Sequence, residues 1–393
     1  MGKKSTLVFG GDTSIGQEGA KFMEGVLPVL ENADVRMVHL EEPFMKEPSE
    51  KVTMDRTTSS LRPLIGRVEL MTLCSNHWYD FGEPGIEDTM DWCRENGILT
   101  SGGGRNIEEA CQPAFFEKDG VRYGVVSFNA IGPTSSFASE TKGGCAYIGF
   151  RRAYIPDAEK DWRAQHRLEY DVHSIREPVE LSGTGMAHNF PDITSWDKAA
   201  SEIAAAKAHC DILVVYFHKG YVHYTGGLAD YERPLCHMAV DNGADVVFAS
   251  HSHLMRGVEV YKGHAIYHGL NAFVMWTPQL APTFKGQIVG EGNEEWIKAR
   301  IKRFGFVPDP SYPTYPFHPT EGIYCMVGKS VIEDGRIVEN RLVPLIVEKS
   351  GVPYPHTEAE EKGQQFMAYL RKITEAEGLD TEYSWDGGEI AVR

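Results

Sequence analysis

The chain has 393 residues, which is enough for one large domain or two moderate ones. Its formal net charge of −17 argues against nucleic acid or an anionic membrane as the main partner, because both attract basic surfaces. A small anionic substrate stays possible, since a bound cation can reverse the sign of the local field. No stretch approaches the roughly 20 apolar residues that a membrane helix needs, and the chain starts without an apolar signal region. The cysteines lack CxxC pairs, so we expect free thiols and a cytoplasmic location.

Strands and helices alternate through the first 250 residues. Hydrophobic runs predict strands at 5–9, 34–40, 68–74, 211–217 and 245–249, and helical spacing predicts helices at 17–31, 84–96, 195–210 and 231–242. We expect Thr194 or Ser195 to cap the third of these helices. The pair Asp119-Gly120 predicts a hairpin between strands 114–118 and 121–129. The alternation indicates an α/β fold.

The later part of the chain has a different character. It contains two further predicted hairpins, at 258–268 and 324–345, and a helix at 357–377. Residues 149–192 and 276–320 interrupt the pattern as long excursions, of the kind that often form lids or binding loops. We therefore expect a core at 1–275, an insertion at 276–320 rich in Pro and aromatic residues, and a C-terminal hairpin and helix at 321–393 that pack back on the core.

Side chains that commonly bind metals stand where the predicted strands end. In open α/β sheets, ligands bind outside the carboxyl ends of the strands, so groups far apart in sequence can meet there. Neutral imidazole suits zinc, manganese or iron, and a carboxylate can bridge two divalent ions. Each position has an ordinary structural alternative, such as a Gly-Asp turn, a solvated strand end or a buried structural histidine. The candidate ligands are Asp12, Glu41, Asn76, His218, His251 and His253.

Other residues could contact a substrate. Gly102-Gly103-Gly104 before Arg105 could cradle a phosphate or simply form a strand-to-helix turn, and an arginine pair could clamp an anion or be a solvated charge pair. The candidate substrate-binding residues are Arg105, Arg151, Arg152, Lys219 and His223.

The ordered set of motifs resembles the CapA family of poly-γ-glutamate capsule biosynthesis proteins, within the metallophosphoesterase-like superfamily. The matching segments run from about residue 5 to 275 and are Gly11-Asp12, Leu40-Glu41, Asn76-His77-x-x-Asp80-x-Gly82, Gly102–Glu109 with Pro113-Ala114, His218-x-Gly220, Gly243–Val247, His251-x-His253, and Gly257–Tyr261 with Asn271-x-Phe273-Val274. The resemblance implies a four-layer α/β/β/α sandwich with long insertions and a centre of one or two metal ions.

The resemblance also implies roles for individual residues. Glu41 takes the bridging carboxylate position, and Asp12 with His253 completes one metal. The other metal is completed by Asn76, His218 and His251, while His77 protonates the leaving group.

Three positions depart from the family pattern. Ser14 stands where the wider superfamily has a histidine ligand, so one metal loses an imidazole. Lys219 replaces a usual Trp, and Ser250-His251-Ser252-His253 replaces a Gly-His-His-Pro-His motif.

The leading hypothesis is a cytoplasmic metal-dependent hydrolase that uses a water activated by Zn, Mn or Fe. The bond would be a phosphoester or an amide such as a γ-glutamyl bond, in a small anionic molecule, with neither nucleic acid nor membrane as partner. The alternative is a non-catalytic or capsule-associated binding protein that retains the fold. The sequence leaves the oligomeric state open.

Overall fold

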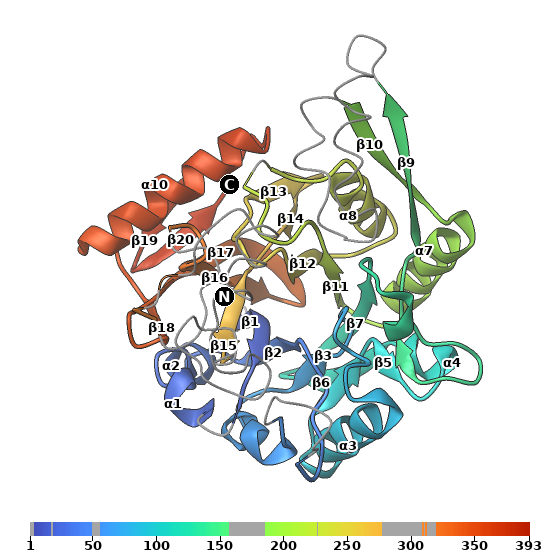
Figure 1. The fold of residues 1–393 in the computed structure, drawn as a ribbon. Helices are drawn as coiled ribbons and strands as arrows, with labels where there is room; N and C mark the ends of the chain where they lie inside the picture. The colour runs from blue at the N-terminus through green and yellow to red at the C-terminus, as the bar shows by residue number, and fades with distance from the viewer. Residues whose placement is uncertain are drawn as a thin grey trace.

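A computed structural model shows two β-sheets packed face to face, with helices outside both of them (Figure 1). The structure describes residues 4–16, 19–48, 56–156, 185–225, 227–276, 309, 311–312 and 320–393.

The larger sheet carries the amino-terminal strands. Within the described residues it has ten strands in the order β19-β20-β17-β16-β1-β2-β3-β4, with β15 also paired to β1 and β18 to β17. Strands β1 to β4 and β15 run parallel, and the others pair antiparallel. Their bounds are β1 Lys4–Ser14, β2 Val35–Leu40, β3 Leu70–Thr72, β4 Leu99–Ser101, β15 Ala272–Met275, β16 Tyr324–Glu333, β17 Arg336–Val347, β18 Pro353–Pro355, β19 Tyr383–Asp386 and β20 Glu389–Val392.

The smaller sheet is built from the middle of the chain. The part that the structure describes has six strands in the order β13-β14-β12-β11-β7-β6, of which β7, β11, β12 and β14 run parallel. Their bounds are β6 Ala114–Lys118, β7 Val121–Asn129, β11 Ile212–Lys219, β12 Val246–His251, β13 Val258–Tyr261 and β14 His264–Tyr267. A short pair, β5 Gly103–Gly104 and β8 Gly144–Cys145, lies apart from both sheets.

Aromatic side chains fill the space between the two sheets. Phe9 of β1 stacks on Tyr216 of β11 and Phe248 of β12, with ring centroids 5.3 and 4.8 Å apart. Helices α7 and α8 cover the outer face of the smaller sheet, and the other long helices pack on the larger one (Figure 1). The helix bounds are α1 Gly19–Met23, α2 Leu27–Glu31, α3 Gly82–Glu95, α4 Ile107–Ala110, α7 Ile193–Lys207, α8 Glu232–Asp241 and α10 Glu361–Ala376, with 3₁₀ turns at Thr58–Leu64 and Thr134–Ser136. The four-layer α/β/β/α sandwich is confirmed.

The two predicted excursions differ in what the structure describes of them. The first begins and ends in an antiparallel ribbon of β9 Phe150–Pro156 and β10 Gly185–Pro191, which projects from the body of the molecule (Figure 1). Residues 157–184 of that excursion and most of 276–320 lie outside the described residues. The C-terminal hairpin β16–β17 pairs with β1, and α10 packs against β17, so this part of the chain joins the large sheet.

Strand β1 is longer than the sequence predicts, and this changes the role of its glycines. The predicted strand ends at residue 9, with Gly10 and Gly11 turning the chain. In the structure β1 continues to Ser14, because β15 pairs with its end. A Cβ on Gly11 would lie 2.0 Å from the backbone oxygen of Asn271. The glycines therefore allow close strand contact, and the strand itself carries Asp12 to the sheet edge.

The predicted helix at 17–31 is interrupted. It forms the two short helices α1 and α2, and Pro28 stands in the first turn of α2, where its missing N–H costs nothing. Gly25 lies in the break, where a Cβ would come within 2.2 Å of the Pro353 carbonyl oxygen. A residue with a side chain would not fit at this point.

Helix α7 is capped two or three residues earlier than predicted. The cap is Asp192, whose Oδ1 accepts a hydrogen bond from the backbone N–H of Ser195 at 3.1 Å.

We expect Asp192→Ala to lower the free energy of unfolding by about 1 kcal/mol, because an N–H at the helix start loses its acceptor. Urea unfolding followed by circular dichroism measures this. The control is Asp197→Ala, an exposed substitution inside the same helix. Equal losses in both variants would contradict the capping role.

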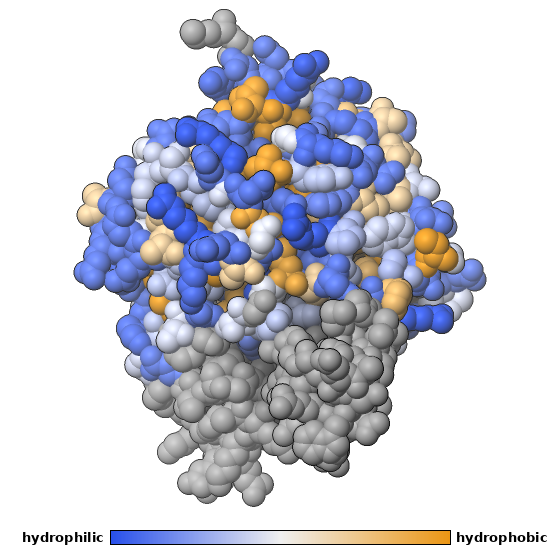
Figure 2. All heavy atoms as spheres, turned by 90° about the horizontal axis from the view of Figure 1, so that it is seen from above, coloured by the Kyte–Doolittle hydropathy of each residue, from blue (hydrophilic) through white to orange (hydrophobic). Residues whose placement is uncertain are grey.

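Among the coloured residues, the face of the molecule in Figure 2 is mainly hydrophilic, with hydrophobic side chains scattered in small groups. Within the described ranges, no helix combines the length and the apolar composition needed to cross a membrane.

Candidate metal centre

The carboxyl ends of the parallel strands in both sheets meet at one rim, and the predicted metal ligands lie there. Asp12 is in β1 and Glu41 follows β2, while His218 and His251 lie at the ends of β11 and β12. These four side chains and His253 are buried. Asn76 and His77, which follow β3, are half-buried.

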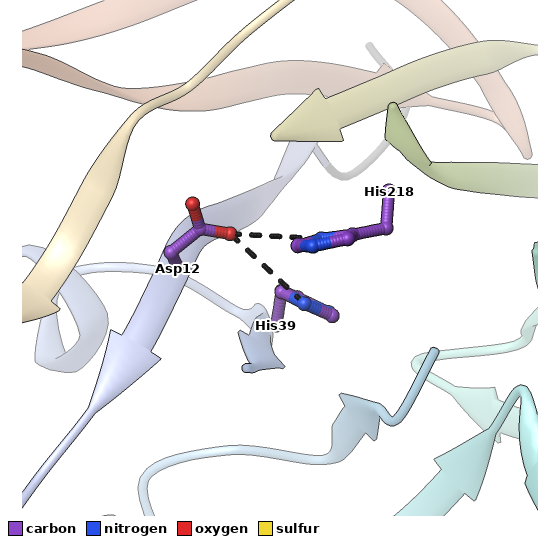
Figure 3. A group of neighbouring side chains, drawn as sticks. All are labelled: Asp12, His39 and His218. Carbon is purple, nitrogen blue, oxygen red and sulfur yellow. Dashed lines mark ion pairs between the residues drawn. The ribbon is translucent and has the colours of Figure 1, made fainter. Parts of the chain in front are cut away.

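Asp12 is the carboxylate shared by two groups of possible ligands. Its Oδ1 lies 4.0 Å from both His39 Nε2 and His218 Nδ1 (Figure 3). Its Oδ2 lies 3.8 Å from His253 Nδ1, and Glu41 Oε1 lies 3.4 Å from His253 Nε2. Two donors that bind one ion at about 2.1 Å can be at most about 4.2 Å apart. Each of these pairs is therefore close enough to share one ion.

The remaining predicted ligands surround His218. Its Nε2 lies 2.8 Å from Asn76 Oδ1, and its ring centroid is 4.6 Å from that of His251. The backbone N–H of His251 donates to Asp12 Oδ2 at 3.2 Å. The family resemblance implies that Glu41 takes the bridging position, whereas in the structure Asp12 belongs to both groups of possible ligands.

The backbone at the histidine motif is strained. His251 has φ of 112° and His253 of 52°, and His223 beside them has 60°. Non-glycine residues rarely adopt such angles, and those that do gather at functional sites because the surrounding structure must hold them there. The His223 ring stacks on that of His253 with centroids 5.4 Å apart, so the structure brings this predicted residue to the centre.

His39 is a candidate ligand that sequence reasoning left out. It lies in β2, buried, with its ring stacked on Tyr216 at 4.4 Å between centroids. Its Nδ1 lies 3.0 Å from Thr72 Oγ1, and its Nε2 has no hydrogen-bond partner among the residues described. Burial lowers the pKa of His39 to about 3, so the ring is neutral, which is the form that binds metals. Since alternate strand residues share a face, its place two residues before Glu41 was an available signal.

The buried carboxylates and neutral imidazoles of this site fit a cation. Burial raises the pKa of Asp12 to about 7, against hydrogen bonds from the Ser250 hydroxyl and the His251 N–H that lower it. Burial, and then the charge of Asp12, raise the pKa of Glu41 well above its usual range. Two adjacent buried carboxylates are costly without a compensating positive charge. Carboxylate oxygens and neutral imidazoles are the donors that divalent zinc, manganese and iron take.

Position 14 contributes no imidazole, and its side chain is engaged elsewhere. Ser14 Oγ donates to Glu42 Oε1 at 2.6 Å, and Arg56 forms a buried ion pair with the same carboxylate at 2.6 Å. Ser14, which stands where the wider superfamily has a histidine, therefore bonds a buried ion pair next to the metal centre.

His77 lies beside the buried ligands at a half-exposed position. Its Nδ1 is 2.7 Å from Asp80 Oδ2, and both side chains are more than a third exposed. His77 directly follows Asn76, whose Oδ1 lies 2.8 Å from His218 Nε2, so the chain brings His77 next to the centre. A carboxylate that holds one ring nitrogen orients the imidazole, as a proton donor requires.

Lys219 does not lie at the centre. Neighbouring residues of a strand point to opposite faces, so Lys219 points away from the face that carries His218. It is buried against Glu232, with Nζ 2.7 Å from Oε2, and its Nζ also donates to the His268 carbonyl oxygen at 3.1 Å. The prediction of Lys219 as a substrate-binding residue is therefore corrected to a buried structural ion pair.

The arginines predicted to bind substrate belong to elements other than those that carry the metal ligands: β9 and the turn between β5 and α4. Arg151 is exposed in β9, and the side chain of Arg152 lies outside the described residues. Arg105 donates to Glu109 and Asp91, at 2.8 and 2.7 Å. The glycines before Arg105 are close-packed: a Cβ on Gly102 would lie 2.3 Å from Ser127 Oγ. This packing supports the turn interpretation of 102–105 over the phosphate cradle.

We expect Arg105→Ala to change KM by less than about twofold, because its partners are two surface carboxylates and exposed ion pairs contribute little. The measurement is steady-state kinetics with a substrate found in the screen proposed below. Arg94→Ala is the matched control, since Arg94 also pairs with Asp91 at 2.7 Å. A rise in KM of about tenfold for Arg105→Ala alone would instead place Arg105 at the substrate.

Comparisons with known proteins identify the family. The model of the bacterial capsule synthesis protein PGA_cap matches residues 6–276. The PGA biosynthesis protein CapA of Bacillus subtilis (strain 168) is 23% identical over 276 residues, which cover 66% of this chain and 59% of the relative. A probable polyglutamine synthesis accessory protein of Mycobacterium tuberculosis is 26% identical over 262 residues, covering 62% of this chain and 56% of that protein. The chain thus spans less than two thirds of the length of these relatives.

Among solved structures, one described as a novel phosphatase from Mycoplasma pneumoniae is 13% identical, with a TM-score of 0.43, and covers 88% of this chain and 95% of that one. The family model matches well over half of the chain, and the ordered motifs of the sequence agree with it. This protein belongs to the bacterial capsule synthesis protein family, PGA_cap.

Proposed function

We propose that this protein is a metal-dependent hydrolase acting on a small anionic substrate. One observation carries the proposal: buried carboxylates and imidazoles gather within ion-binding distance at the sheet rim, beside the half-exposed pair of His77 and Asp80. Burial of the ligands keeps water from competing for them. The partial exposure of His77 leaves it accessible to a substrate.

The predicted ligands divide by distance. Asp12, Glu41 and His253 would hold one ion, since each offers one donor atom and the three atoms all lie within 4.8 Å of one another. Asn76, His218 and His251 surround the other side of Asp12. A bound divalent ion would lower the pKa of a water molecule and polarise the scissile group.

The chain's own residues would manage the proton and the substrate. Asp80 orients the His77 ring through Nδ1, and His77 would give a proton from Nε2 to the leaving group. His223, stacked against His253, would line the pocket. We propose no nucleic-acid or membrane partner, which the net charge of −17 supports. We also propose a cytoplasmic location, which the free cysteines support.

The scissile bond is a phosphoester or an amide. Phosphoesters are the usual substrates of the superfamily that the sequence resembles. The B. subtilis relative is named for PGA biosynthesis, which supports a γ-glutamyl amide. Both give a tetrahedral or trigonal-bipyramidal transition state with developing negative charge, which a cation stabilises.

The test begins with the metal content of purified protein by mass spectrometry. It continues with turnover of p-nitrophenyl phosphate, bis-p-nitrophenyl phosphate and γ-glutamyl-p-nitroanilide, with added Mn²⁺, Zn²⁺ or Fe²⁺. We expect turnover of at least one substrate class that is lost on chelation and restored by metal. Protein that binds no divalent ion, or binds it without any turnover, would contradict the proposal. Cell fractionation that found the untagged protein with membranes would contradict the location.

The second candidate is a binding protein of capsule assembly without catalysis. Ser14 in place of an imidazole ligand favours it, as does the accessory role in the name of the mycobacterial relative. It predicts that the metal binds and that the protein retains poly-γ-glutamate or its fragments without cleaving them. The same assay, followed by analysis of the retained polymer, separates the two candidates.

A further inference from the structure

The centre contains an imidazole that none of the predicted roles uses. His39 lies opposite Asp12 in the pairing of β1 with β2, and both side chains are fully buried. Figure 3 shows the ring of His39 and the ring of His218 approaching the same Asp12 oxygen from two strands of different sheets. The 4.0 Å separation of each nitrogen from Asp12 Oδ1 falls within the reach of a single ion.

Hydrogen bonds fix which nitrogen of each ring can bind a cation. Asn76 Oδ1 can only accept, so His218 Nε2 donates to it at 2.8 Å, and the neutral ring keeps its lone pair on Nδ1. That nitrogen lies 3.3 Å from the Tyr216 hydroxyl and 4.0 Å from Asp12 Oδ1. His39 has the reverse arrangement. Its Nδ1 can donate to Thr72 Oγ1 at 3.0 Å, which leaves the lone pair on Nε2, also 4.0 Å from Asp12 Oδ1. Metal-binding histidines are held in this way by a partner on the other ring nitrogen.

His39 Nε2 is also an orphaned buried atom. It has no hydrogen-bond partner among the described residues, although buried polar groups are rarely left unpaired. Thr72 and the stacked ring of Tyr216 hold the imidazole in place, so it cannot turn to find another partner. A cation between His39, Asp12 and His218 would satisfy this nitrogen.

We propose that His39 is a metal ligand, and that His39 Nε2, Asp12 Oδ1 and His218 Nδ1 form an inner ion site. The outer ion lies among Asp12 Oδ2, Glu41 and His253, so Asp12 bridges the two. In this arrangement β2 supplies the imidazole that Ser14 does not, and Asn76 positions the His218 ring. The inference rests on the proposed metal-dependent function and specifies a two-ion centre for it.

The experiment measures metal binding directly. Protein stripped with a chelator is titrated with Mn²⁺ by calorimetry, and the loaded protein is examined by electron paramagnetic resonance. Two Mn²⁺ ions that share a carboxylate give an exchange-coupled spectrum, whereas one ion gives an isolated spectrum. We expect two ions per chain and a coupled spectrum in the wild type.

The variant His39→Asn tests the ligand. Its amide nitrogen can keep the hydrogen bond to Thr72 while Nε2 is removed, so we expect one ion, an isolated spectrum and a second binding event weakened by at least about 100-fold.

The matched control is His264→Asn in β14. His264 is partly exposed and bonds the Asp245 carbonyl oxygen at 3.1 Å, and should leave both ions in place. Circular dichroism of the stripped proteins checks folding. If the Asn variant does not fold, His39→Gln is used, and its second ion should bind about tenfold more weakly.

The outcomes are distinct. Two ions in His39→Asn with unchanged affinities, or a single ion in the wild type, would overturn the inner site while leaving a one-ion hydrolase intact. A wild type that binds no ion would overturn the proposed function itself. Loss of one ion in His39→Asn alone supports the inner site whether or not a substrate has been found.

Discussion

In the His77→Ala variant we expect turnover to fall by about 10²–10⁴-fold, the usual contribution of a general acid. The imidazole would protonate the leaving group, and without it that group must depart as an unfavourable anion. The metal content should stay unchanged, because the close donor pairs join Asp12, Glu41, His253 and His218 and do not include His77. Kinetics on metal-loaded protein, with metal analysis of the same sample, measures both quantities.

Two comparisons sharpen this test. Asp80→Asn keeps a side chain beside His77 Nδ1 but removes the charge, so we expect a smaller loss of about 10-fold to 100-fold. Added imidazole should partly restore the His77→Ala variant, which a purely structural role would not allow. A substrate whose leaving group needs no proton, such as p-nitrophenolate, should lose less than an alkyl ester. Unchanged turnover of an alkyl ester in His77→Ala would remove the proposed acid.

The sequence predicted the ligands at the sheet rim because the patterns that indicate them are local. A hydrophobic strand that ends in a polar side chain can be recognised within a few residues, and the parallel strands then bring their ends together. For this reason Asp12, Glu41, His218, His251 and His253 were proposed without any knowledge of which strands are neighbours. The same reasoning predicted the three hairpins, which turn at short Gly-containing pairs.

What the sequence could not predict depends on contacts between distant segments. The extension of β1 through Asp12 depends on its pairing with β15, some 260 residues later. The close approach of Gly25, between α1 and α2, to the carbonyl of Pro353 joins segments far apart in the sequence. His39 shares a strand face with Glu41, but its approach to His218 depends on the packing of the two sheets. Lys219 follows His218 in β11, so its side chain lies on the opposite face of the strand, where it pairs with Glu232.

The centre carries destabilising features that a cation would relieve. His251 and His253 have positive φ angles, and Asp12 and Glu41 are buried carboxylates side by side. Each feature costs free energy in the metal-free protein. Each also helps to hold the carboxylate and imidazole donors close to one another. Metal affinity and the stability of the stripped protein should therefore change in opposite directions when the shared carboxylate is altered.

Asp12→Asn tests this directly. The amide replaces a charged ligand common to both groups, so we expect metal affinity to fall by at least about 100-fold and metal-dependent turnover to disappear. The stripped variant should melt at a higher temperature than stripped wild type at pH 8. Burial raises the pKa of Asp12 to about 7 from an ordinary 3.8, so the folded wild type loses stability as the pH rises between these values. Asn cannot ionise, so the advantage of the variant should shrink as the pH is lowered to about 5.5.

The matched control for Asp12→Asn is Ser14→Ala, two residues further along the same strand. Ser14 is buried like Asp12, but its hydroxyl bonds Glu42 rather than the possible ligands. We expect Ser14→Ala to leave metal affinity unchanged and to destabilise the protein slightly at every pH, because a buried hydrogen bond is lost. If Asp12→Asn kept wild-type metal affinity, neither ion could depend on that carboxylate. If it melted below the wild type at pH 8 in chelator, burial of the Asp12 charge would not be the strain that the cation relieves.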